Sequence, residues 1–204
     1  PRGLRSFASR LLNGPLPEEF ELHELPDESA DGFVGPDGPA GVVAAGALAT
    51  GAAAADAVID ESELFTPVVS RYSFVWLTHR QTIDDVIAGF EAAWAFFGGV
   101  FATVIPDNMK TIVETADALE PRLNQAFVEY AQARGFVVDP ARVRSPQDKP
   151  RVERVVPFVR NSFFAGETFI DLADAQRRAE DWCRERAGMR VHGTTQLRPA
   201  ELRG

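Results

Sequence analysis

The chain has 204 residues, of which 45% are hydrophobic, and a formal net charge of −9. This length can bury a core without help from disulfides or metals, and the single cysteine, Cys183, can form neither an internal disulfide nor a cysteine-based zinc site. No apolar run reaches the roughly 20 residues that a membrane helix needs, and no leader-like segment opens the sequence. These features predict a soluble cytoplasmic protein.

The negative charge is concentrated at the start of the chain. Residues 1–65 hold 3 of the 21 basic and 12 of the 30 acidic residues, so the remainder is neutral. Within that remainder, residues 140–160 have an excess of four positive charges, which predicts either a surface that binds DNA phosphates or an ordinary solvated loop and helix face. The basic residues of this stretch are Arg142, Arg144, Lys149, Arg151, Arg154 and Arg160.

Residues 1–64 differ in character from the rest. The stretch that runs from Gly35 to Asp60 is low in complexity and has neither the period of a strand nor that of a helix. Its small alanines and glycines are poor material for a core. We therefore expect residues 1–64 to be largely disordered, with at most a short helix around Ala52 to Ile59.

From residue 65 onward the sequence alternates between strand-like and helix-like segments. Thr82 and Asp85 have the spacing of a helix start, and Gly98 and Gly135 are typical of helix ends. Such alternation is typical of an α/β fold in which helices flank a central sheet. In chain order, the expected elements are a strand at 73–78, a helix at 82–97, a strand at 100–105, a helix at 121–135, a strand at 136–138, a helix from 150 and a helix at 172–187.

Two acidic residues stand where such a fold usually places its chemistry. Asp107 directly follows an apolar strand, and Glu153 lies 46 positions later in the first turn of an expected helix. Taken separately, the first is typical of a turn and the second of a helix start. If they converge, their oxygens suit Mg²⁺ or Mn²⁺, and a third carboxylate would be needed to hold two ions for phosphoryl transfer.

Between residues 65 and 202 the chain contains, in this order, the runs SRYSFVWLTHRQTIDDVIAGFEAAWAFFGGV, VIPDNMK, PRLNQAFVEYAQARGFVVDPARVRSPQDKPRVERVVPFVR, FFAGETFIDLADAQRRAEDWC and GMRVHGTTQLRPAE. These runs resemble, in the same order, transposases of the IstA type, which belong to the integrase catalytic-core superfamily of insertion sequences. The resemblance implies a ribonuclease-H-like core, DNA as substrate, an Asp-Asp-Glu metal triad, and a helper ATPase of the IstB type as partner. Asp107 matches the second triad residue and Glu153 the third.

The sequence departs from this family before residue 65, where the first strands and the first triad aspartate are not recognisable. We therefore expect a partial integrase core at residues 65–165 that lacks its first strands, followed by a helical extension at 166–204. The composition before residue 65 suggests a truncated or frame-disrupted copy. An open sheet edge would also favour self-association as a homo-oligomer.

Three functional hypotheses follow. The first is a DNA transposition protein that binds Mg²⁺ through Asp107 and Glu153 and contacts DNA through the basic residues between positions 142 and 160. The second is a non-catalytic module that binds DNA, the helper ATPase or an intact transposase. The third is an unrelated α/β domain in which these acids are structural.

Overall fold

The computed structural model describes residues 42–53, 58–107, 109–115, 122–140, 155–193 and 195–203. The chain divides into two compact units, Pro1–Phe33 and Val34–Gly204, and every described residue belongs to the second. In these ranges no helix has both the length and the apolar character needed to cross a membrane.

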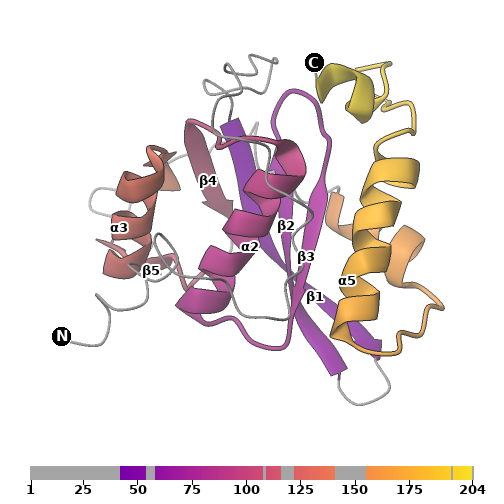
Figure 1. Ribbon diagram of the computed structural model, residues 1–204, viewed down its shortest axis with the longest axis horizontal. Coiled ribbons are helices and arrows are strands. Elements are labelled where there is room, and N and C mark those ends of the chain that lie inside the picture. Colours follow the sequence, from indigo (N-terminus) through magenta and orange to yellow (C-terminus); the bar gives the residue numbers. More distant parts are fainter. Residues whose placement is uncertain are drawn as a thin grey trace. The chain divides into compact units, whose positions relative to one another are not determined.

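A five-stranded sheet forms the centre of the second unit (Figure 1). Its strands, in spatial order, are β3 (Phe74–Thr78), β2 (Val58–Pro67), β1 (Val42–Ala53), β4 (Thr103–Asp107) and β7 (Val137–Val138). The first three strands form an antiparallel meander, while β4 is parallel to β1 and β7 is parallel to β4. A separate antiparallel pair consists of β5 (Val113–Thr115) and β6 (Arg122–Leu123).

The strands β1 and β2 correct two expectations. Residues 42–53 and 58–64 were expected to be disordered or briefly helical, and the core was expected to lack its first strands; both expectations are wrong. The cause is tertiary pairing. β1 pairs with β2 on one side and with β4 on the other, and Val43 and Ala45 are fully buried in it. A central position stabilises a strand whose small residues have little strand preference of their own.

The local signals after residue 65 are largely confirmed. Helix α2 (Ile83–Phe97) begins with the predicted capping box, in which Thr82 and Asp85 satisfy each other's backbone N–H groups, and ends at Gly98 in the left-handed conformation. Helix α3 (Gln125–Arg134) ends at Gly135 as expected but begins later than Pro121, because Asn124 caps it and β6 occupies the preceding residues. The C-terminal helix is α5 (Leu172–Asp181), which continues as the π-helical turns η3 (Trp182–Ala187).

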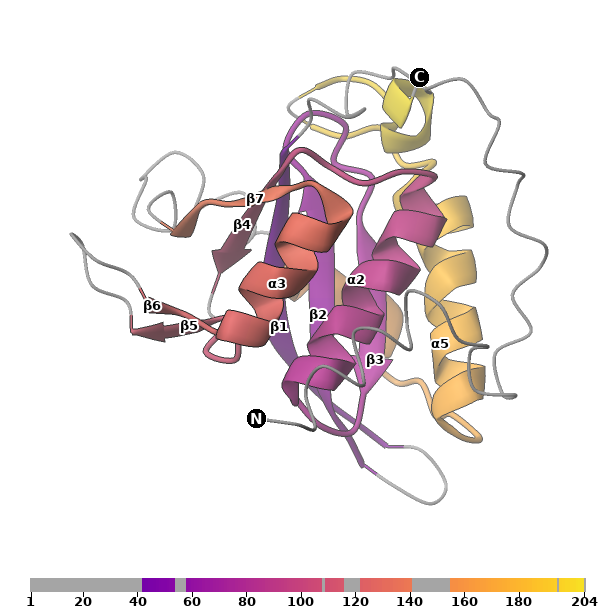
Figure 2. The ribbon, with the colours of Figure 1, turned by 60° about the vertical axis from the view of Figure 1, so that its left-hand side comes forward.

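Helices α2 and α3 lie together on one face of the sheet, and α5 packs along β3 (Figure 2). An aromatic cluster fills the space under α2. The Phe90 ring is fully buried there, with its centroid 4.9 Å from that of Phe65 and 5.1 Å from that of Phe127. Trp94 Nε1 donates a hydrogen bond to the Tyr130 hydroxyl over 2.9 Å, which joins α2 to α3. This core fixes the sheet on which the candidate site is built.

Candidate metal centre

Asp107 is the last residue of β4, and its neighbours in the strand explain its place. Val104 and Ile105 are buried in the sheet, and the strand ends two residues later at position 107. The parallel register of β1 and β4 pairs position 107 with Gly46. In open α/β sheets the carboxyl ends of parallel strands are the usual location of ligands, and the predicted position of Asp107 at a strand end is confirmed.

Strand β1 brings no carboxylate to this location. Its sequence, VVAAGALATGAA, contains no aspartate or glutamate, and the position beside Asp107 is a glycine. Asp60 on β2 does not compensate, because Leu64 is the β2 residue level with Gly46 and Asp60 lies four residues, or about 13 Å, further along the strand. Asp37 and Asp56 lie outside the described residues. The described positions level with Asp107 on β1 and β2, Gly46 and Leu64, are thus not acidic.

Glu63 is close in sequence but is committed to a different environment. It is fully buried and pairs with position 47 of β1, and its Oε2 would lie only 2.4 Å from a side chain built onto Gly89 of α2. Neither of its carboxylate oxygens has a hydrogen-bond partner. Burial, with a smaller contribution from Asp85, holds the pKa of Glu63 well above its ordinary value. Glu63 is therefore directed under α2, and its position does not mark it as a ligand at the end of β4.

The other predicted site residues are largely outside the structure's described ranges. Glu153 and the basic residues Arg142, Arg144, Lys149, Arg151 and Arg154 all fall there. Arg160 is described, and it is exposed at the beginning of the π-helical turn η2 (Arg160–Phe164), which follows a helical segment at residues 155–159. The convergence of Asp107 with Glu153 therefore stays a prediction.

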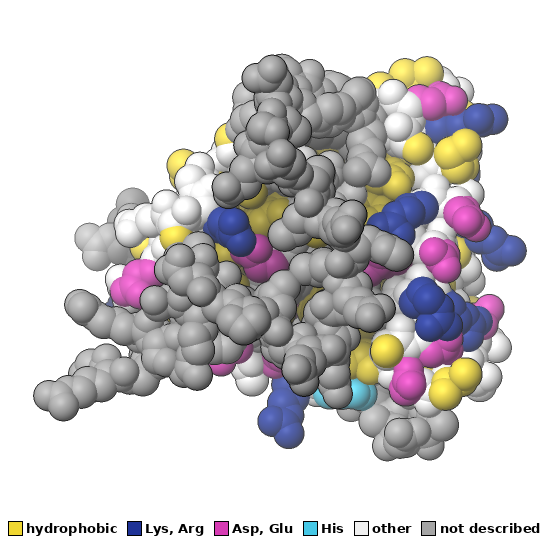
Figure 3. Space-filling model, in the orientation of Figure 1, with side chains coloured by type: hydrophobic (Ala, Val, Ile, Leu, Met, Phe, Trp, Pro, Cys, Tyr) yellow, Lys and Arg dark blue, Asp and Glu magenta, His cyan; other side chains and the backbone are white. Residues whose placement is uncertain are grey.

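The described residues contain no second candidate site for a metal ion or a phosphate group. No cluster of three or more His, Cys, Asp or Glu side chains occurs in that part of the chain. Cys183 is fully buried, and burial raises the pKa of its thiol to about 12. Figure 3 shows acidic and basic side chains intermixed over the region of α5, where Arg178 pairs with Asp174 and Arg184 with Glu180. Such a mixed surface lacks the uniform positive charge that would attract phosphates.

Comparison with solved structures defines the class of fold. A simian T-cell lymphotropic virus intasome, solved in complex with the PP2A regulatory subunit B56 gamma, matches 90% of this chain and 60% of its own with a TM-score of 0.61 and 14% identity. The catalytic core domain of HTLV-2 integrase, solved with magnesium in a dimeric form, matches 81% of this chain and 97% of its own with a TM-score of 0.55 and 14% identity. The chain has the ribonuclease-H-like fold of integrase catalytic cores, as the sequence predicts.

Sequence relatives narrow this class. A Mycobacterium tuberculosis protein named "Putative transposase" is 42% identical over 121 residues, which are 59% of this chain and 30% of that protein. The transposase for an IS21-like insertion sequence element of Bacteroides fragilis is 27% identical over 133 residues, 65% of this chain and 26% of its own. No family model matches the chain. The chain is similar in sequence to proteins named as transposases, among them that of an IS21-like insertion sequence element, and it spans about a third or less of the length of these relatives.

Proposed function

We propose that this chain acts in DNA transposition, with Asp107 and Glu153 as ligands of a divalent cation at the carboxyl end of β4. The observation that carries the proposal is the position of Asp107 at the end of a parallel strand in an integrase-type sheet. The relatives named as transposases support the choice of DNA as substrate. The exposed Arg160 and the basic residues from Arg142 to Arg154 would contact phosphates, and a helper ATPase of the IstB type would be the protein partner.

The donor set fits one cation better than two. Mg²⁺ is often held by one or two carboxylates, with water and substrate phosphates completing its shell. Asp107 and Glu153 would satisfy that requirement, but β1 supplies no carboxylate to bridge a second ion. When bound, Mg²⁺ or Mn²⁺ would polarise a phosphodiester and lower the pKa of the attacking water or hydroxyl. The roles of the chain's own residues would be to hold the DNA backbone and to place that cation against it.

The glycine beside Asp107 favours a second candidate function. Because the position beside Asp107 is Gly46, the chain could bind DNA, the helper ATPase or an intact transposase without cutting DNA. This non-catalytic module would keep its basic surface, and its DNA affinity would fall steeply with salt as counterions compete for the phosphates. The two candidates therefore differ in chemistry and agree in binding.

An assay of DNA cleavage and strand transfer separates the two candidates. The wild-type chain and the Asp107→Asn variant would be incubated with supercoiled plasmid in Mg²⁺ or Mn²⁺. In parallel, filter binding would measure the DNA affinity of both proteins as the salt concentration rises from about 50 to about 200 mM. For the transposase, we expect weak wild-type nicking that Asp107→Asn abolishes. Salt-sensitive binding by both proteins with no nicking by either would contradict the catalytic proposal and support the module.

A further inference from the structure

Strand β3 forms one edge of the five-stranded sheet, and an edge strand ordinarily presents a row of unpaired backbone groups. Alternate residues of a strand direct these groups to opposite sides. In β3, Val75 and Leu77 direct theirs away from β2, toward the side where α5 lies. With its sequence FVWLT, β3 also has the apolar and aromatic composition that favours pairing with a further strand.

The side chain of Gln176 on α5 occupies the hydrogen-bonding positions of that missing strand. The Leu77 N–H donates to Gln176 Oε1 over 2.9 Å, and Gln176 Nε2 donates to the Val75 carbonyl over 3.2 Å. In an antiparallel pair, a carbonyl and the N–H two residues further along bind an N–H and a carbonyl that belong to two different residues of the neighbouring strand. The primary amide of Gln176 offers the same donor and acceptor.

A second side chain from the same helical segment takes the remaining group. The Val75 N–H donates a hydrogen bond to the sulfur of Cys183, which is fully buried in η3. Gln176 and Cys183 lie seven residues apart, which is about two helical turns, so both face β3. The outward backbone groups of Val75 and the outward N–H of Leu77 are therefore all satisfied by side chains.

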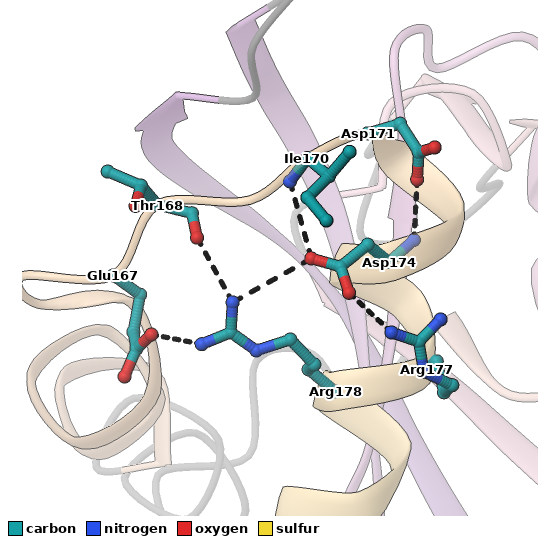
Figure 4. Close-up of polar contacts among 7 residues, drawn as sticks. All are labelled: Glu167, Thr168, Ile170, Asp171, Asp174, Arg177 and Arg178. Carbon is teal, nitrogen blue, oxygen red and sulfur yellow. Dashed lines mark hydrogen bonds and ion pairs between the residues drawn. The ribbon is translucent and has the colours of Figure 1, made fainter.

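Polar contacts at the start of α5 hold this arrangement in place (Figure 4). Asp171 caps the helix by accepting from the Asp174 N–H, and Asp174 in turn accepts from the Ile170 N–H. Arg178 bridges back to the Glu167 carboxylate and the Thr168 carbonyl. The segment before α5 is thereby fixed to its first two turns, which include Gln176.

We propose that Gln176 takes the place of a pairing strand and closes the β3 edge against strand addition by the β3 strand of a second copy of this chain. The occupant would be a second β3 because the Val75 carbonyl and the Leu77 N–H, once freed from Gln176, are complementary to the same two groups of a second copy in an antiparallel arrangement. Cys183, about two turns further along the helical segment, contributes to the same closure by accepting the hydrogen bond from the Val75 N–H. The C-terminal helix thus ends the sheet where another strand would otherwise extend it.

Sedimentation velocity over a range of protein concentrations tests this proposal with Gln176→Leu. The matched control is Gln132→Leu, which places the same leucine on an exposed position of α3. We expect Gln176→Leu to form dimers or larger species as concentration rises, while Gln132→Leu sediments like the wild type. Sedimentation of Gln176→Leu that matches the wild type at every concentration would overturn the proposal.

Hydrogen exchange gives a readout that does not depend on association. In Gln176→Ala at low concentration, we expect the Leu77 amide to exchange about tenfold faster than in the wild type, because its acceptor is gone. The Leu64 amide, in the buried strand β2, serves as the reference for global stability. Equal acceleration at Leu64 and Leu77, or no acceleration at Leu77, would show that Gln176 does not protect this edge and would overturn the proposal.

Discussion

The Glu63→Val variant is expected to be more stable than the wild type by about 2 kcal/mol at pH 8, because it removes a buried polar group that has no partner. Glu63 is fully buried on β2, and neither carboxylate oxygen accepts a hydrogen bond. Its Oε2 lies against Gly89 and Trp76, so the surroundings offer the carboxylate apolar contact rather than solvation. Valine suits this position because it is β-branched and close to glutamate in volume.

The pH dependence of this effect follows from the direction of the pKa shift. Burial raises the pKa of Glu63 in the folded state above its value in the unfolded chain. The folded state therefore binds the proton more tightly, and stability falls as the pH rises from about 4.3, the ordinary value for glutamate, toward the raised pKa. In Glu63→Gln this titration is absent. The stability of Glu63→Gln relative to the wild type should therefore increase with pH across that window.

Urea denaturation at a series of pH values between about 4 and 9, followed by circular dichroism, measures the stability of both Glu63 variants relative to the wild type. The control is Glu114→Val, which makes the same change at an exposed strand position on β5 and should alter stability by less than about 0.5 kcal/mol. A loss of stability in Glu63→Val at pH 8, or a constant difference between Glu63→Gln and the wild type at every pH, would show that Glu63 is well solvated in the folded state.

The Gly46→Asp variant is expected to bind Mn²⁺ at least about tenfold more tightly than the wild type and to gain nicking activity on plasmid DNA. The register of β1 and β4 places position 46 beside Asp107, and adjacent strands are about 4.8 Å apart. An aspartate at position 46 would place a carboxylate next to Asp107. It would add a third acidic ligand to Asp107 and Glu153 from β1, which has no acidic residue of its own.

The nicking assay in Mn²⁺ measures this gain, and Gly46→Asn is its control. Asparagine has the size of aspartate without its charge, so it reports any effect of adding a side chain to β1. Near-ultraviolet circular dichroism would verify that both variants keep their tertiary packing. If Gly46→Asp folds but nicks DNA no faster than Gly46→Asn, then β1 does not face the site, and the assignment of Asp107 as a metal ligand loses its structural basis.

The fold after residue 65 could be predicted because its signals are local. Thr82, Asp85 and Gly98 mark the two ends of α2 by hydrogen bonds that each residue makes within one turn. Strand β1 could not be predicted in this way. Its alanines and glycines show no periodic pattern, and its structure depends on pairing with two other strands. Of these, β4 is far from β1 in sequence, and β2 has only a weak strand pattern in its own sequence.

The candidate site was predictable only in part for a related reason. Asp107 follows an apolar strand, and that local pattern predicts its place at the sheet's edge. Which residue faces it from β1 depends on strand register, and only the structure identifies Gly46. Glu63 illustrates the same point, since a glutamate buried without a partner in a central strand contradicts the pattern that sequence normally follows there. Residues 42–53 and 58–64 thus form strands that were not expected, with side chains poorly suited to them.

Mn²⁺ titration by electron paramagnetic resonance tests most directly whether Asp107 and Glu153 share a cation. The wild type would be compared with Asp107→Asn and Glu153→Gln, each of which keeps its shape and loses one charge. We predict that the wild type binds one Mn²⁺ and that either substitution alone weakens binding by at least about tenfold. Binding that is unchanged in either variant would contradict a shared site, and with it the proposed metal-dependent role of this chain in transposition.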